Sequence, residues 1–128
     1  MSEKSPNNNY ALLQLSFELK VSPKNFLAQS HEAAKVIAST EGLIWKLWIS
    51  QEEESKTGGV YLFANRESAE AYLNHPVVQA ACSNPAVKSA KSQIWEIENS
   101  LSVLTRAPLP TRWGRSSELE TLIAGGVQ

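Results

Sequence analysis

Aromatic side chains are the residues of this chain whose types and spacing best suit the binding of a small molecule. Two tryptophans lie three residues apart in the segment 42–51, and two tyrosines and a third tryptophan follow in later patterned segments. The candidate substrate-binding residues are Trp45, Trp48, Tyr61, Tyr72 and Trp95. Such side chains could line a flat apolar pocket in which indole N–H and phenol O–H groups orient an aromatic ligand. The alternative is that they pack in the core and in a subunit interface, where aromatic residues are also common.

Two further residues could transfer a proton or hold a charge beside such a pocket. His31 lies beside the apolar positions of an expected helix, and histidine is a common general base near neutral pH. Lys46 lies between the two tryptophans and could stabilise an anion by its charge. We take both as candidate catalytic residues. As structural alternatives, His31 could lie at the exposed edge of its helix, and Lys46 could pair with a glutamate or reach solvent.

Composition and charge argue against several other classes of protein. The chain has 128 residues, 42% of them hydrophobic, which suits a single ordinary globular domain. The net charge of −1 gives no electrostatic reason to expect binding to nucleic acid or to an anionic membrane. No apolar run approaches the roughly 20 residues of a membrane-spanning helix, and residues 1–10 lack the apolar stretch of a secretory signal.

Cysteine and histidine usage gives two further expectations. Cys82 is the one cysteine and cannot form an internal disulfide, so we expect a cytoplasmic protein. His31 and His75 are the only histidines, and neither belongs to a spacing typical of metal ligands. We therefore expect no metal ion and no cofactor.

Hydrophobic periodicity predicts the elements that position these residues. Alternation of apolar and polar residues predicts strands, and apolar residues at i, i+3 and i+4 predict helices. The expected strands cover residues 10–19, 43–51, 60–64 and 87–98. The expected helices cover residues 23–38, 66–74 and 77–82, with a further short one at 117–123. Pro23 and Asn65 are typical of helix starts, whereas His75-Pro76 should end one helix and begin the next, with His75 as a helix stop or cap. Gly58-Gly59 should form a turn or bulge before the third strand.

The order strand, helix, strand, strand, helix, strand is typical of the ferredoxin-like split βαβ fold, an α+β fold with helices on one face of a four-stranded antiparallel sheet. Because strand side chains alternate, Leu43 and Trp45 should share one face and Trp48 should lie on the other, although the sequence does not say which tryptophan faces the helices. The face without helices would be apolar, which predicts a homodimer with paired sheets. We expect a disordered segment at 1–9, the domain at 10–103 and a C-terminal extension at 104–128.

Three short segments carry a resemblance to a known family. The sequences GLIWKLW at 42–48 and GGVYLF at 58–63, followed by Ser68-Ala69 and Tyr72-Leu73, closely resemble the YdhR-like family of mono-oxygenases. The resemblance extends over residues 10–101. It implies a dimeric α+β barrel, in which two ferredoxin-like subunits pair their sheets. It also implies a similarity in fold to small mono-oxygenases that oxidise polycyclic phenols to quinones without metal or flavin.

The resemblance implies an oxidoreductase, a cofactor-independent mono-oxygenase that acts on an aromatic or quinol-like small molecule between helices and sheet. It assigns no catalytic residue. On this hypothesis His31 would deprotonate a phenol, the anion would pass an electron to O₂, and Lys46 would stabilise phenolate or superoxide. The alternative is a non-catalytic dimeric module that binds a small apolar ligand or a protein partner and needs no base. Haem binding is a third possibility and would require His31 or His75 as axial ligand.

Overall fold

The computed structural model describes residues 9–110, and the expected short helix at 117–123 and nearly all of the expected disordered segment lie outside them. Four strands form one antiparallel sheet in the order β2-β3-β1-β4. The strands are β1 (Ala11–Leu19), β2 (Leu43–Gln51), β3 (Lys56–Phe63) and β4 (Val87–Glu96). The helices are α1 (Pro23–Ala28), α2 (His31–Ala38), α3 (Arg66–Leu73), α4 (Pro76–Ser83) and α5 (Asn99–Leu104), with a 3₁₀ turn, η1 (Glu52–Glu54).

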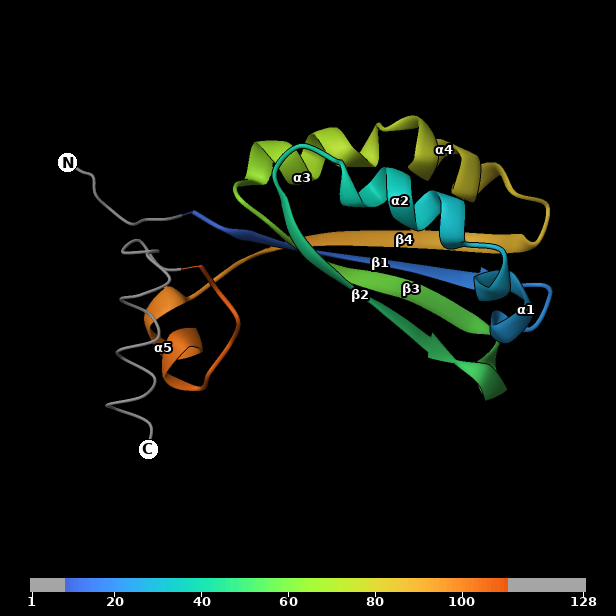
Figure 1. Ribbon diagram of the computed structural model, residues 1–128. Coiled ribbons are helices and arrows are strands. Elements are labelled where there is room, and N and C mark those ends of the chain that lie inside the picture. The colour runs from blue at the N-terminus through green and yellow to red at the C-terminus, as the bar shows by residue number, and fades with distance from the viewer. Residues whose placement is uncertain (1–8, 111–128) are drawn as a thin grey trace. The chain divides into compact units, whose positions relative to one another are not determined.

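One face of the sheet is covered by α2, α3 and α4 (Figure 1). This arrangement is the ferredoxin-like α+β fold that the element order predicts. The chain divides into two compact units, of which Tyr10–Glu96 contains the whole sheet, while α5 belongs to the other. The domain boundary expected after residue 103 stays a prediction.

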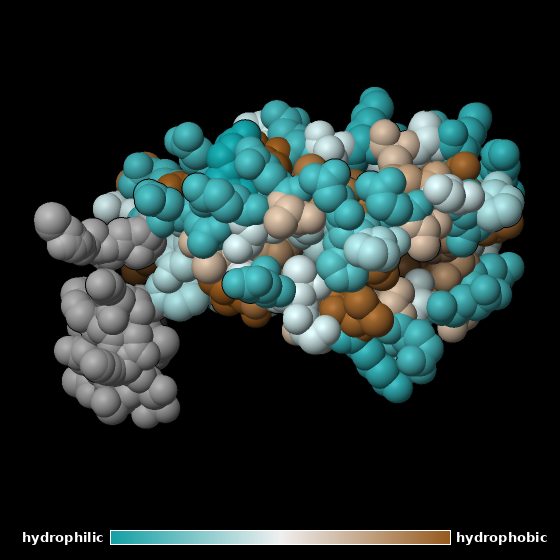
Figure 2. Space-filling view, turned by 90° about the horizontal axis from the view of Figure 1, so that it is seen from above, coloured by the Kyte–Doolittle hydropathy of each residue, from teal (hydrophilic) through white to brown (hydrophobic). Residues whose placement is uncertain are grey.

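The core lies between β1 and the helix layer. The five inward side chains of β1 are all buried, with exposed fractions from 0% to 8%; they are Ala11, Leu13, Leu15, Phe17 and Leu19. They pack with Tyr61 and Phe63 of β3 and with one buried residue or more from each covering helix. The strict alternation of β1 is therefore the pattern of a central strand with one face in the core. The outer surface of the helix layer is mostly hydrophilic, as expected for amphipathic helices (Figure 2).

Local capping explains where α3 and α4 begin. The Asn65 side chain accepts a hydrogen bond from the backbone N–H of Ser68 at 2.8 Å, which satisfies a donor at the start of α3. Nδ1 of His75 accepts one from the backbone N–H of Val77 at 3.0 Å, and Pro76 occupies the first turn of α4. The expected stop at His75-Pro76 and the role of His75 as a helix cap are confirmed.

The helix expected over residues 23–38 is divided in two by Gln29 and Ser30. Both residues have backbone angles outside the helical region. The Ser30 hydroxyl donates to the carbonyl of Phe26 at 3.2 Å, a local bond of the kind that competes with helix continuation. The periodicity of the apolar residues continues across the break, so the sequence pattern alone did not reveal it.

Strand β3 begins four residues earlier than expected. Gly58 and Gly59, which we expected to form a turn or bulge, lie inside the strand and pair with both of its neighbours. A side chain at Gly58 would collide with the backbone of Leu15, and one at Gly59 would collide with the Lys46 side chain. The glycines therefore serve close approach within the sheet.

A bulge near the start of β2 decides which of its residues face the helices. Leu43 pairs with Phe63 and Trp45 with Leu62, so Ile44 is the extra residue. Leu43 consequently packs on the core, whereas Trp45 lies on the opposite face. The expectation that Leu43 and Trp45 share a face is wrong, because plain alternation does not anticipate a bulge.

We expect Asn65→Ala to lower the free energy of unfolding by about 1 kcal/mol, because it removes the cap of α3. Asn65→Asp retains a side-chain acceptor and should lose much less. Urea denaturation followed by circular dichroism measures both variants, and equal stability of the two would contradict the capping role.

Candidate functional site

A cavity of about 250 Å³ lies between the helix layer and the sheet. Its apolar wall includes Leu15, Phe17, Ala33, Ile37, Val78 and Ala81. Its chemically distinctive groups come from three elements: Lys46 and Trp48 from β2, Tyr61 from β3, and Tyr72 from α3. We refer to this space as the inner cavity.

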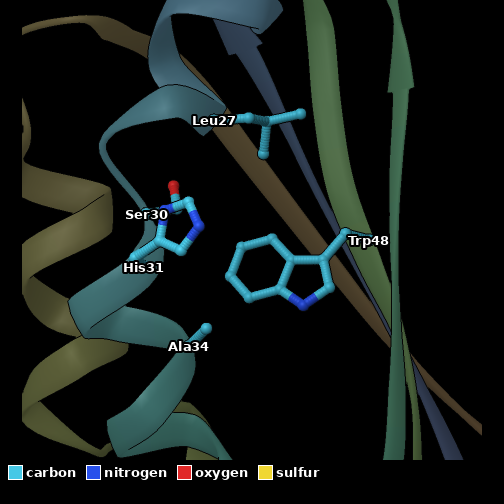
Figure 3. Close-up of a pocket in the computed structure, with 5 residues that line it drawn as sticks. All are labelled: Leu27, Ser30, His31, Ala34 and Trp48. Atoms are coloured by element: carbon cyan, nitrogen blue, oxygen red, sulfur yellow. The ribbon is translucent and has the colours of Figure 1, made fainter.

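A second, more open pocket of about 220 Å³ lies beside it. One wall of this pocket consists of Leu27 near the end of α1 and of Ser30, His31 and Ala34 near the start of α2. These four side chains face the Trp48 indole across the pocket (Figure 3). We refer to this space as the outer pocket. Trp48 and Ser30 line both spaces, so the indole is a shared wall between them. Ser30, at the break between α1 and α2, and His31, the first residue of α2, both line this pocket.

Lys46 is held among aromatic rings. Its Nζ atom lies 3.3 Å from the centroid of the Trp48 ring and 4.7 Å from that of Tyr61. Among residues 9–110, no carboxylate forms a salt bridge with it. Burial lowers the pKa of Lys46 from 10.5 to about 7, because a charged amine is poorly solvated there. A lysine in this state can carry or release a proton near neutral pH.

Tyr61 and Tyr72 form a buried pair of phenols in the wall of the inner cavity. Their hydroxyl oxygens are 3.1 Å apart in a hydrogen bond, and their ring centroids are 5.0 Å apart. Burial raises the pKa of both hydroxyls, most strongly that of Tyr61. Both residues are therefore neutral at physiological pH and act as hydrogen-bond donors, not as bases.

The structure brings together some of the predicted site residues and separates others. Lys46, Trp48, Tyr61 and Tyr72 line the inner cavity, and His31 lines the outer pocket. The tryptophan that faces the helices is Trp48. Trp45 and Trp95 lie on the other face of the sheet, where the Trp95 indole N–H donates to Oε1 of Gln14 at 3.0 Å.

Sequence reasoning missed two polar residues of these walls, Gln29 and Asn84. Each lies at the end of a helix, in a position where amphipathic periodicity gives no signal. The proximity of Lys46 to Tyr61 was in principle accessible. The two residues are directly opposite each other in the β2–β3 pairing, but the late start predicted for β3 hid that register.

Two absences hold for the part of the chain that the structure describes. Within residues 9–110 there is no group of three or more His, Cys, Asp or Glu side chains that could hold a metal ion. Over the same residues, no helix has both the length and the apolar character needed to cross a bilayer.

Comparison with known families is decisive for classification. The family described as "Putative mono-oxygenase ydhR" matches residues 12–108, most of the chain. The chain belongs to the YdhR family. The match covers the four strands and four helices around the inner cavity, and the resemblance seen in the sequence is thereby confirmed. No curated protein matches the chain significantly.

Solved structures with the same fold include several small bacterial proteins. Protein SO0527 from Shewanella oneidensis has a TM-score of 0.59 at 13% identity, over 73% of this chain and 95% of that one. SnoaB from Streptomyces nogalater, a cofactor-independent oxygenase, has a TM-score of 0.58 at 12% identity, over 73% and 97%. NE2512 from Nitrosomonas europaea, a protein of unknown function, has a TM-score of 0.57 at 19% identity, over 80% and 95%. At these identities the comparison establishes the shared fold.

The pKa of Lys46 predicts a specific dependence of stability on pH. Between about pH 7 and 10.5 the unfolded chain binds more protons than the folded protein, so the burial cost declines as pH rises through this window. At pH 6 both states are charged and the cost is complete. We expect Lys46→Met to be more stable than wild type by about 1–3 kcal/mol at pH 6. The full pKa shift, at about 1.4 kcal/mol per pKa unit, would give a larger difference, but the contacts with the aromatic rings stabilise the charged lysine and reduce it.

Urea denaturation at pH 6 and pH 10 measures this difference, which should shrink at the higher pH. Lys35→Met is the matched control, because Lys35 is exposed and pairs with Glu32. A Lys46→Met difference that stays constant between the two pH values would mean that Lys46 titrates in the folded protein as it does in the unfolded chain.

Proposed function

We propose that this protein is a cofactor-independent mono-oxygenase that oxidises an aromatic or quinol-like small molecule in the inner cavity. The observation that carries the proposal is the Lys46 amine, which titrates near neutral pH inside an aromatic cavity large enough for a small ligand. Membership of the mono-oxygenase family supports the reaction class. The similarity to SnoaB supports the fold on which this chemistry would run.

The proposed reaction begins with transfer of the phenol proton to neutral Lys46. The phenolate then gives one electron to O₂, and the resulting phenoxyl radical and superoxide combine to form a carbon–oxygen bond. Loss of water from the resulting hydroperoxide leaves a quinone. Phenol and O₂ are thus converted to quinone and water: one oxygen atom enters the product, and the ring supplies the electrons that reduce the other. Protonated Lys46 stabilises the anions formed on the way.

The remaining candidates have supporting roles in this proposal. Trp48 holds the Lys46 side chain by its ring and offers a flat apolar surface to a substrate. Tyr61 and Tyr72 supply hydroxyl donors. His31, in the outer pocket, is the second candidate base and would act on a substrate bound there.

A non-catalytic binding module is the second candidate function. Its support is the outer pocket, whose walls are almost wholly apolar and open to solvent. A ligand bound there by Leu27, Ala34 and Trp48 would require no base.

Oxygen consumption with a panel of hydroquinones and naphthols tests the oxygenase proposal. We expect turnover by the wild type, with kcat/KM falling as pH drops below about 7, because Lys46 must be neutral to accept the proton. Lys46→Met should lose at least about 100-fold in kcat/KM, the lower end of the usual contribution of a general base. Trp48→Phe should lose less, because an aromatic surface remains.

Two further variants assign the base. Lys35→Met should retain full activity because this lysine is exposed, and His31→Ala should retain most of it if Lys46 is the base. If His31→Ala were the inactive variant, the base would be His31 in the outer pocket. Oxygen consumption no faster than that of the buffer with every phenol tested would leave the binding module as the function.

We also propose that the protein acts as a homodimer through the sheet face opposite the helices. Leu47, Ile49 and Trp95 lie on that face and are 57%, 43% and 46% exposed. Apolar side chains in this number on one face of a sheet are typical of an interface. A second copy is the occupant that we propose, because the same exposed apolar side chains on each subunit can meet under twofold symmetry.

We expect sedimentation velocity to show a dimer for the wild type and a monomer for Leu47→Glu, because a carboxylate would be buried in the interface. Val36→Glu is the control, since Val36 is 44% exposed on α2, away from the sheet. A wild-type monomer, or a Leu47→Glu dimer as stable as that of the wild type, would contradict this interface.

A further inference from the structure

The hydroxyl groups of Tyr61 and Tyr72 have one more hydrogen than they can use between them. A phenol carries a single O–H donor, so the pair has two hydrogens. Their mutual hydrogen bond, with oxygens 3.1 Å apart, uses one of these, whichever residue donates it. Among the described residues, neither hydroxyl has another hydrogen-bond partner. The second hydrogen is therefore available to an acceptor that residues 9–110 do not supply.

This spare donor is buried and borders the inner cavity. Tyr61 and Tyr72 are each only 2% exposed, and both line the cavity wall. Buried polar hydrogens are nearly always paired in folded proteins, since an unpaired one loses its bond to water without replacement. An oxygen atom of a bound molecule at this position would complete the pairing.

Lys46 adds a second polar group on the same side of the cavity. Its Nζ atom is 4.7 Å from the centroid of the Tyr61 ring, so amine and phenol pair border one region of the wall. A ligand hydroxyl can accept the spare tyrosine hydrogen and give its own proton to the amine. An ether oxygen can only accept, and an unsubstituted aromatic ring can do neither.

The volume of the cavity limits the size of such a ligand. About 250 Å³ is slightly below the usual range of roughly 300–1,000 Å³ for ligand pockets. The aromatic and aliphatic wall suits a flat ring system. One ring or two fused rings fit well within this space, and a third ring would occupy most of it.

We propose that the inner cavity takes a phenol of one or two rings, with its hydroxyl oxygen between the Lys46 amine and the spare hydrogen of the Tyr61–Tyr72 pair. The inference rests on the proposed function for its site and names the substrate class. Once the proton has passed to Lys46, the tyrosine hydrogen bonds to a phenolate oxygen, and hydrogen bonds to charged acceptors are the stronger kind. Tyr61 and Tyr72 are thereby specificity-determining residues.

The first experiment measures binding without O₂, so that no turnover can occur. The full chain is titrated by calorimetry under nitrogen with 2-naphthol, 2-methoxynaphthalene and naphthalene. We expect 2-naphthol to bind at least about tenfold more tightly than either analogue, because it alone can both donate and accept. The analogues share its two rings, so shape and apolar contact are matched. A three-ring phenol, 2-anthrol, should bind more weakly than 2-naphthol.

The second experiment assigns the selectivity to the tyrosine pair. The double variant Tyr61→Phe/Tyr72→Phe should lose about tenfold in affinity for 2-naphthol and keep its affinity for naphthalene, because both rings remain. Either single variant should lose less, since the remaining phenol still has one free hydrogen. Comparison of the single and double variants separates loss of the spare donor from loss of the mutual bond.

A third readout follows the proton. Bound 4-nitrophenol should show its phenolate absorption at a lower pH than the free compound does, and Lys46→Met should remove this shift. If Lys46 had a purely structural role, 4-nitrophenol bound to wild type and to Lys46→Met would show the phenolate absorption at the same pH.

The outcomes separate this inference from the proposed function. Equal affinity for 2-naphthol and 2-methoxynaphthalene, or no binding of 2-naphthol, would overturn the inference, and so would 2-anthrol binding as tightly as 2-naphthol. The spare hydrogen would then belong to a water molecule. Selective binding of 2-naphthol under nitrogen, with no oxygen consumed in air, would support the inference and refute the oxygenase.

Discussion

The site depends on the burial of one lysine on a strand face that otherwise meets the core. Lys46 points toward the helices, where no carboxylate from the described residues pairs with it. The Trp48 ring two residues along the strand and the Tyr61 ring across from it take the place of a counter-ion. Gly59 provides the space, because any side chain there would meet the Lys46 side chain. Three neighbouring positions in the β2–β3 pairing thus surround one largely buried amine.

The topology and much of the core could be predicted from the sequence because they follow from local rules. Alternation along β1 matched its buried face, and Asn65 and His75 marked helix starts by the bonds they make. What escaped prediction depends on contacts between segments distant in sequence. The glycines at 58 and 59 look like a turn until Leu15 and Lys46 are placed against them.

The candidate site was predicted in its composition but not in its geometry. Period-2 alternation separates Trp45 from Trp48, yet it does not say which face meets the helices. The bulge at Ile44 places Lys46 and Trp48, and not Trp45, on the same face as Leu43. A bulge is a feature of the pairing with β3, so the sequence of β2 alone does not reveal it. The ionisation of Lys46 could not be deduced either, because it depends on burial and on the absence of a partner.

The position of β2 at the edge of the sheet has a consequence for how such a site can diverge. Lys46 and Trp48 lie on a strand with a single neighbour, and Trp48 is 40% exposed, whereas Tyr61 and Tyr72 are embedded in the core. Substitutions at Lys46 and Trp48 therefore disturb fewer packing contacts than substitutions in the core, so new reactivity can be acquired at these two positions at a small cost in stability. Changes at the tyrosines affect core packing and recognition together. The fold thus places a readily varied set of residues on the edge strand and a constrained set in the core, around one shared cavity.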